Sequence, residues 1–421
     1  MAGVNIEDFG ASFIKYLPKV TKTLNMTSVA RKIPKGKMKW SGAEHVERVV
    51  HVGLNGAISF LPDGGNLPAA GQQSYVRAKA YRKHLAGTVQ LTDGVLKSCG
   101  TSKQSAISVV DSELRGLMES IRKLENFMFT RDGSGQCAVI GNNAAVDLSA
   151  TPADATINVD DARGLWAGKD YSTSDGSLDG QGDLVVTGTF TVAKVARAID
   201  GSDKAEVTLS GATGTFAEND KVFWGTGDQL AFGRCPSGLS KMIDDSPTVF
   251  QNIDVDKYPH YGSPCIRKAG AALAAEDIRQ MLAMLKQEGS GSLDGITVLT
   301  NVWNCTDLEE LYHDKLQISP DTKTLGIAAV KFQSALGSVK IITDPDSPYG
   351  EMFFLDPSEI TRLVQSELAW RKNGKNGSIF RASDSALIYR ASCMEMHEYM
   401  INKRNSSGKI SGLADSKKSA Y

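Results

Sequence analysis

The stretch from Phe60 to Leu91 holds the residue types that most suggest binding chemistry, because a glycine-rich segment precedes a basic one. The glycines are Gly64, Gly65 and Gly71, and the basic residues are Arg77, Lys79, Arg82 and Lys83. A phosphate-binding loop needs the pattern GxxxxGK[ST] between a buried strand and a helix. These glycines instead lead into "QQSYVRAK", which alternates like a strand, and no GK[ST] occurs. The pattern therefore argues against a nucleotide site.

No set of residues predicts a catalytic centre, a metal site or a cofactor. The six cysteines are scattered, without a CxxC pair, which is typical of reduced thiols; they are Cys99, Cys137, Cys235, Cys265, Cys305 and Cys393. Neither HExxH nor GxSxG is present. A cation could be imagined among Asp344, Asp346 and Asp356, but the turn sequence "DPDSP" explains the first two. Trp166, Trp224 and Trp303 are expected in a core or interface. We therefore expect a protein that is not an enzyme.

Composition indicates a globular chain with an uneven charge distribution. Of the 421 residues, 41% are hydrophobic and 23% are charged. No apolar run approaches the about 20 residues that span a bilayer, and the N-terminus lacks the pattern of a signal peptide. Residues 1–100 carry a net charge of +8, which leaves −9 for the rest. Such asymmetry favours binding to a polyanion or contact between unlike regions of neighbouring subunits.

The first hundred residues predict an arm followed by a long hairpin. Residues 1–40 end in "ARKIPKGKMKW", which favours an extended basic arm, although a merely solvated terminus is an alternative. Residues 46–60 and 74–91 predict two strands joined by the loop 61–73. On the second strand, the alternation puts Tyr75, Arg77, Lys79 and Tyr81 on one face and Val76, Ala78 and Ala80 on the other.

The segment 102–130 predicts the longest helix. Its apolar residues recur at spacings of three and four: Ile107, Val110, Leu114, Leu117, Ile121, Leu124 and Met128. The opposite face is charged, with Glu113, Arg115, Glu119, Arg122 and Lys123. Gly133 and Gly135 end the pattern. A helix of this kind usually lies across a sheet or a subunit boundary, and a coiled coil is the weaker alternative.

The rest of the chain predicts a β domain and then a mixed region. Residues 151–240 consist of short alternating strands bounded by glycine and aspartate. This segment contains 13 acidic and seven basic residues. Beyond Ser240, "AAEDIRQMLAMLKQEGSGS" predicts a helix, and "GITVLTN", "VKIITD" and "GEMFFLD" predict strands. "TDLEELYHDKLQ" predicts a helix that begins with a capping box of Thr306 and Glu309. "PSEITRLVQ" favours a short helix, residues 378–405 a strand pair, and residues 406–421 a loose tail.

This order of parts resembles the major capsid protein of tailed bacteriophages, with the Hong Kong 97 type fold, an α+β fold. Three stretches carry the resemblance: "SYVRAKAYRKHLAGTVQLTDGVL", "LRGLMESIRKLENFMFTRDGSGQ" and "VKIITDPDSPYGEMFFLDPSEI". The resemblance implies an N-terminal arm (1–45), an extended loop (46–98), a spine helix with the first part of the peripheral domain (99–150), an inserted β domain (151–240), an axial domain (241–360), and a second peripheral part with the C-terminal tail (361–421).

By the same resemblance, the chain would assemble into hexamers and pentamers of an icosahedral head around double-stranded DNA, in the host cytoplasm. Separate scaffolding, portal and decoration proteins would be partners, and no membrane would be involved. The candidate contacts between subunits are Tyr75, Arg77, Lys79, Arg82, Lys83, Arg115 and Glu119. Some relatives cross-link lysine to asparagine, for which Lys79 or Lys83 and Asn373 or Asn376 are considered. The alternatives are an encapsulin-like compartment shell and a ligand-binding protein that uses the β domain.

Overall fold

The computed structural model describes most of the chain from residue 28 to residue 414. The segments outside the description are 1–27, 41–43, 64, 95–105, 142–145, 150–152, 197–204, 247, 290–292, 294, 313–328, 335–336, 373–378, 383–386 and 415–421. Predictions for the extreme N-terminus, Cys99, the first turn of the long helix, Asn373, Asn376 and the last residues fall there.

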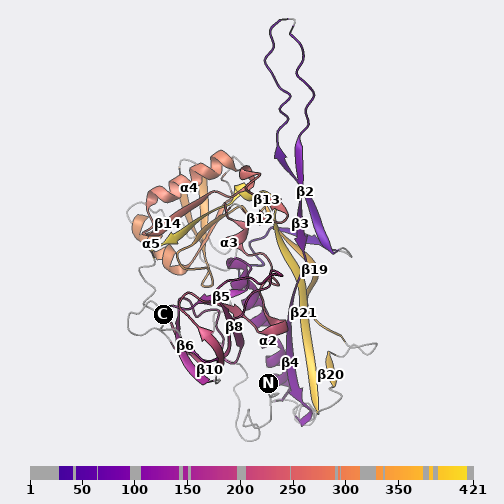
Figure 1. Cartoon of the computed structure of the whole chain (residues 1–421), viewed down its shortest axis with the longest axis vertical. Helices are drawn as coiled ribbons and strands as arrows, with labels where there is room; N and C mark the ends of the chain where they lie inside the picture. Colours follow the sequence, from indigo (N-terminus) through magenta and orange to yellow (C-terminus); the bar gives the residue numbers. More distant parts are fainter. Residues whose placement is uncertain are drawn as a thin grey trace.

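The described chain folds into three packed bodies and one projecting hairpin (Figure 1). The hairpin consists of β2 (His45–Gly53) and β3 (Ser74–Tyr81), which pair antiparallel from His45 opposite Tyr81 to Gly53 opposite Ser74. Residues 54–73 extend beyond the paired part, so the loop is longer than expected. Ala78 and Ala80 are buried whereas Tyr75, Arg77 and Tyr81 are exposed. The predicted alternation of the second strand is thereby confirmed over this part.

The predicted second strand is in fact two strands. After the break at Arg82, β4 (Lys83–Thr92) leaves the hairpin and pairs antiparallel with β21 (Ile388–Ile401). This sheet has the order β1-β19-β21-β20, with β4 on the other side of β21. Its remaining strands are β1 (Gly36–Lys39), β19 (Ile360–Trp370) and β20 (Phe380–Ala382). The helix expected in "PSEITRLVQ" is wrong, because its β-branched and apolar residues extend as β19 instead.

The basic N-terminal segment is anchored rather than free. β1 pairs in parallel with β19, and Val29, Ala30, Ile33 and Trp40 are buried in the core beside it. The described part of the predicted arm, residues 28–40, is therefore an edge of the sheet.

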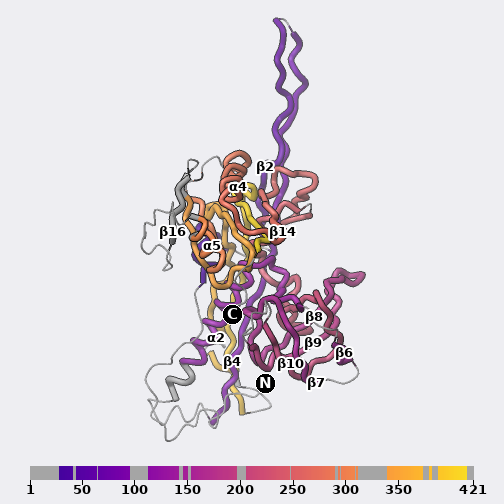
Figure 2. The backbone as a smooth tube through the Cα atoms, turned by 90° about the vertical axis from the view of Figure 1, so that its left-hand side faces the viewer, coloured from indigo at the N-terminus to yellow at the C-terminus, as the bar shows by residue number. Residues whose placement is uncertain are grey.

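The long helix α2 (Ala106–Thr130) lies across this sheet and packs on β4, as its apolar stripe predicts (Figure 2). Gly87 of β4 lies beneath it, and a Cβ atom there would approach Leu117 and Ile121 of the helix to within 3 Å. Gly87 therefore permits the close approach of strand and helix. The last helical turns, from Glu125 to Thr130, are entirely buried.

The β domain is an antiparallel sheet of order β5-β11-β8-β9-β10-β6, with β7 also paired to β10. The strands are β5 (Gln136–Val139), β6 (Val146–Asp147), β7 (Ala153–Val159), β8 (Asp170–Ser174), β9 (Gly188–Ala196), β10 (Ala205–Phe216) and β11 (Lys221–Trp224). The sheet thus begins at Gln136 rather than at residue 151. Trp166 and Trp224 meet edge to face with ring centroids 4.9 Å apart in this domain.

The axial body is a mixed sheet of order β14-β22-β18-β15-β17-β16 with helices α4 and α5 against it (Figure 2). Its elements are β14 (Cys265–Ala271), α4 (Ala275–Glu288), β15 (Thr297–Thr300), α5 (Val302–Tyr312), β16 (Ala329–Ser334), β17 (Gly337–Thr343), β18 (Met352–Leu355) and β22 (Gly408–Leu413). β22 lies between β14 and β18, so the part of the tail expected to be loose is a central strand.

The remaining elements are short. They are η2 (Gly227–Gln229), α3 (Leu239–Met242), β12 (Val249–Phe250), β13 (Ile253–Asp254), η3 (Pro259–Tyr261) and η4 (Arg404–Ser406). The predicted capping box is wrong: α5 begins at Val302, which puts Thr306 inside the helix, where its hydroxyl donates to the carbonyl of Trp303. None of the described helices is long and apolar enough to span a membrane.

Candidate assembly surfaces

In the paired part of the hairpin, one carboxylate contacts three basic side chains. Glu47 of β2 lies 3.1 Å from the His45 ring, 3.3 Å from Arg77 and 3.2 Å from Lys79. The hydrogen bonds from His45 and Lys79 hold the pKa of Glu47 below its usual value. Because these groups are exposed, each pair contributes little to stability. The pairs fix the register and leave the charge of this face nearly balanced.

The structure divides the seven predicted contact residues between two places. Tyr75, Arg77 and Lys79 lie on the hairpin, where the Tyr75 ring packs at a tilt against His51 with centroids 5.2 Å apart. Arg82 and Lys83 lie at the hairpin base and contact their own chain, since Lys83 donates to the Gly233 carbonyl at 2.5 Å and Arg82 to Gln365 at 3.5 Å. Arg115 is exposed and Glu119 is half-buried on α2. No single patch brings all seven together.

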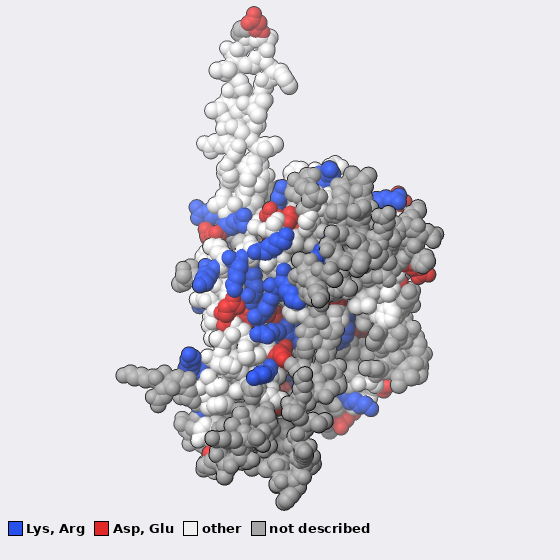
Figure 3. Space-filling model, turned by 180° about the vertical axis from the view of Figure 1, so that it is seen from behind, with Lys and Arg blue, Asp and Glu red and all other residues white. Residues whose placement is uncertain are grey.

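None of the seven predicted contact residues lies at the tip of the hairpin, residues 54–73. Leu54, Ile58 and Leu67 are 85–86% exposed and Phe60 is fully exposed. Figure 3 shows the projecting arm almost free of charge except at its end. The one charged residue between positions 54 and 73 is Asp63. Large apolar side chains on a projecting arm mark a protein–protein contact. The signal was present in "GLNGAISFLPDGGNLPAA", which combines bulky apolar residues with almost no charge.

A buried charge cluster ties the hairpin-bearing sheet to the spine helix. Glu125 of α2 and Glu395 of β21 share two guanidinium groups, those of Arg31 and Arg362. Tyr399 donates to Glu125 at 3.0 Å. Both carboxylates are almost fully buried, and paired buried charges of this kind specify one arrangement of the elements that carry them. The cluster therefore joins the N-terminal segment, α2, β19 and β21.

His397 lies inside this cluster without a hydrogen bond from any described group. Its ring nitrogens are 3.6 Å from Glu125 and 3.5 Å from Glu395, and burial lowers its pKa to about 4, so the ring is neutral near pH 7. These three residues have the types and spacing of a metal site. The carboxylate oxygens, however, are bound by two arginines, and a cation would have to displace them. The donor set therefore suits an ion-pair network better than a metal.

A second junction connects α2 to the axial body through Asn126, which is fully buried. Its amide nitrogen donates to Asp344 at 3.0 Å and to Asp346 at 2.7 Å, and its oxygen accepts the N–H groups of Val29 and Ala30. The turn expected at "DPDSP" is present, with the Asp346 N–H donating to Asp344 at 3.1 Å. Besides forming this turn, the two aspartates accept hydrogen bonds from Asn126 and so connect the turn to α2.

Lys123 completes this second junction. Its ammonium group lies 2.5 Å from Asp346, although the sequence pattern placed it on the exposed face of the helix. Burial, together with the charge of Asp346, raises the pKa of Asp344 to about 6. Asn126, Lys123 and the two aspartates thus form one polar network between α2 and the end of β17.

The comparisons with known proteins agree with this arrangement. Residues 215–399 match the family model of the SU10 major capsid protein. The cyanophage A-1(L) capsid subunit matches over 98% of this chain and 99% of its own, with 11% identity and a TM-score of 0.55. The capsid of the native GTA particle matches over 97% of both chains, with 10% identity and a TM-score of 0.51. No curated protein sequence matches the chain.

By sequence, the chain is similar to a major capsid protein over residues 215–399. Its fold is that of the Hong Kong 97 type, as the order of parts in the sequence indicated.

One buried carboxyl of the protein makes its stability depend on pH. Glu398 accepts the N–H groups of Ser237 at 2.7 Å and of Tyr399 at 2.9 Å, and burial raises its pKa to about 7. Between about pH 4.5 and 7 the folded subunit holds a proton that the unfolded chain releases, so this group makes stability fall as pH rises. The lowered pKa of His397 makes stability rise with pH between about pH 4 and 6.5, because the unfolded chain holds a proton there that the folded subunit lacks.

Glu398→Gln isolates this contribution, since glutamine keeps the acceptor but cannot ionise. Between pH 4.5 and pH 8 we expect the native subunit to lose about 3 kcal/mol of unfolding free energy through this carboxyl, and the variant to lose none through it. Urea unfolding of both proteins at the two pH values measures this difference. An unchanged difference would show that Glu398 has an ordinary pKa in the folded subunit.

Proposed function

We propose that the subunit forms the hexamers and pentamers of an icosahedral head around double-stranded DNA, and that its hairpin lies over a neighbouring subunit. The observation that supports this most is the projecting arm of residues 54–73. Four large apolar side chains on it contact no core of their own chain. An isolated two-stranded arm is marginal in water, so a neighbouring copy that covers it would stabilise it.

The basic N-terminal segment is a candidate for contact with the packaged DNA. Lys32, Lys35, Lys37 and Lys39 are exposed along residues 31–39, and Lys37 pairs with Glu367. Figure 3 shows basic side chains gathered on the face of the body below the hairpin. Contact with phosphates through such lysines would be independent of base sequence and would weaken with salt. The acidic β domain would then face away from the DNA and suit decoration proteins.

The seven candidate contact residues have different parts in this proposal. Tyr75 and Arg77 are exposed on β3 of the hairpin and suit contact with the neighbour, and so do Arg115 and Glu119 on α2. Lys79, Arg82 and Lys83 have partners in their own chain and support the hairpin base. Lys79 and Lys83 are the lysines considered for cross-linking, and both would have to leave these partners first.

The partners proposed for assembly are a separate scaffolding protein and a portal, and the place of assembly is the host cytoplasm. Expression of the full chain, alone and with its scaffold, followed by electron microscopy of the purified protein tests the proposal. We expect closed shells, capsomers or tubes. A product that stays monomeric in every condition would contradict it.

A further inference from the structure

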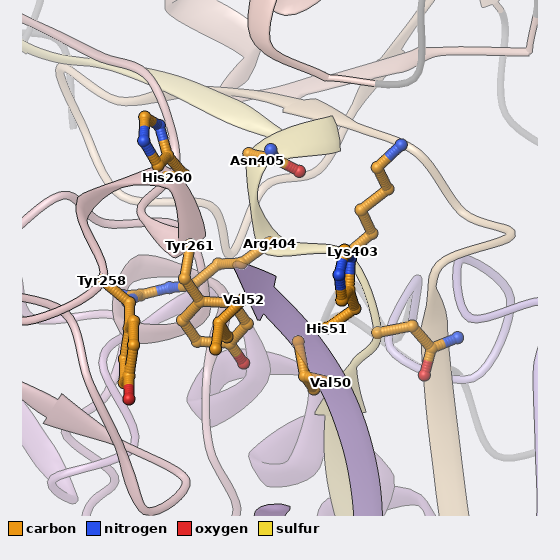
Figure 4. A pocket seen from close by; sticks show the side chains of 10 residues that line it. Val50, His51, Val52, Tyr258, His260, Tyr261, Lys403, Arg404 and Asn405 are labelled. Atoms are coloured by element: carbon orange, nitrogen blue, oxygen red, sulfur yellow. The ribbon is translucent and has the colours of Figure 1, made fainter. Parts of the chain in front are cut away.

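A cavity of about 170 Å³ lies at the root of the hairpin, between β2, η3 and η4. Figure 4 shows its side chains converging from these three elements. The ten residues that line it are Val50, His51, Val52, Tyr258, His260, Tyr261, Asn402, Lys403, Arg404 and Asn405. The set includes a lysine, an arginine and two histidines but no acidic residue. We call this cavity the root notch.

Two buried donors of the root notch lack a partner among the described residues. Arg404 is 2% exposed, and it donates through Nε to the Met242 carbonyl and through Nη2 to the Lys241 carbonyl, but Nη1 has no acceptor. The hydroxyl of Tyr261, which is 6% exposed, is also unpaired. Unsatisfied buried donors are costly, and a cation without its anion is the most costly of all.

The surroundings of Arg404 do not supply that anion. Its guanidinium lies over the Phe250 ring at 4.6 Å, and burial lowers its pKa despite the nearby Asp244 and Asp245. Asp244 already lies 3.6 Å from Lys409 and 3.4 Å from Arg267. The notch therefore has the donors and the charge to accept a carboxylate, with Val50 and Val52 beside it to contact an apolar neighbour of that carboxylate.

The hairpin tip has the matching chemistry. Asp63 is exposed at the turn "FLPDGG" and is the one charged residue of the arm, flanked by Leu61 and Pro62. The ten residue steps from Gly53 to Asp63 span about 33 Å when extended. Figure 1 shows the tip far from the root of its own hairpin. The tip can therefore reach only the root notch of another copy.

We propose that Asp63 at the tip of one subunit docks in the root notch of a neighbouring subunit, with its carboxylate accepting from Arg404 and Tyr261 and pairing with the exposed Lys403 at the rim. The inference rests on the proposed function, because it names the surface that receives the arm. A tip-to-root contact joins two different surfaces, and contacts of this kind close into rings when the rotation between copies permits. The contact would thereby link the arm of each subunit to the arm of the next.

Charge exchange at the rim of the notch tests this contact. Asp63→Lys and Lys403→Glu are each expected to lower particle yield about tenfold or more, because one lost ion pair at a repeated contact is multiplied over many copies. The double variant with both changes is expected to recover most of the yield. Glu218→Lys is the matched control, an exposed acid of the β domain that should assemble as the native chain does.

A disulfide between Asp63→Cys and Asn405→Cys gives a second readout that does not depend on yield. Oxidised particles of this double variant should run as covalent multimers on a denaturing gel, whereas each single variant should not. Two results would overturn the tip-to-root contact. One is normal particle yield from all the charge variants. The other is a loss of yield in the single variants that the double variant does not recover, together with no cross-linking of the cysteine pair. Failure of the native chain to assemble would instead count against the proposed function.

Discussion

Replacing residues 54–73 by an Asn-Gly turn is expected to give a folded subunit that no longer assembles. Gly53 and Ser74 are the last opposed residues of β2 and β3, so a two-residue turn can close the strands there. The removed residues make no core contact and expose Leu54, Ile58, Phe60 and Leu67. Circular dichroism and thermal unfolding should match the native subunit, while electron microscopy should show at least about a hundredfold loss of particles.

The boundaries of this deletion matter. A deletion of residues 61–90, which covers the predicted loop 61–73 and nearly all of the predicted strand 74–91, would remove β3 and most of β4. Because β4 pairs along ten positions with β21, that change would damage the body as well as the arm. Ile58→Ser with Phe60→Ser gives a version at full length. Particles of normal yield from both the shortened arm and this double variant would contradict the role of the arm.

Asn126→Ala is expected to be the most damaging single change in the body. It leaves two backbone N–H groups, those of Val29 and Ala30, without an acceptor and removes the donor to Asp344 and Asp346. Unsatisfied buried groups each cost about 1–3 kcal/mol, so a total loss of about 4 kcal/mol is expected. Urea unfolding of the isolated subunit measures this loss.

Arg122→Ala is the matched control for Asn126→Ala, because Arg122 is exposed on the same helix. We expect a change within about 0.5 kcal/mol for this surface position. Equal effects of the two substitutions would show that the junction between α2 and the axial body contributes no more than an ordinary helix position does.

The sequence predicted those elements whose apolar period is unbroken. The stripe of α2, the buried run of β15 and the alternation of β3 all gave the right type of element, because local burial and local period agree there. The prediction failed where pairing partners are distant. "PSEITRLVQ" has no strong period, and its extension as β19 depends on β1 and β21 at either side.

The polar junctions were hidden from the sequence for a related physical reason. Glu125 and Asn126 lie within an apolar helical run, but nothing local shows that their partners are Arg31, Asp344 and Tyr399. The charged residues of the hairpin have types that suggest chemistry, which the apolar tip lacks. The structure shows that several of them pair within the chain, whereas the apolar tip has no partner there among the described residues.

A cryo-electron microscopy map of the assembled particle, detailed enough to trace residues 45–81, tests the central claim most directly. The account predicts that the hairpin of each subunit lies on an adjacent subunit, with Leu54, Ile58, Phe60 and Leu67 covered by that neighbour. A shell in which the hairpin projects into solvent, or folds back on its own subunit, would contradict it.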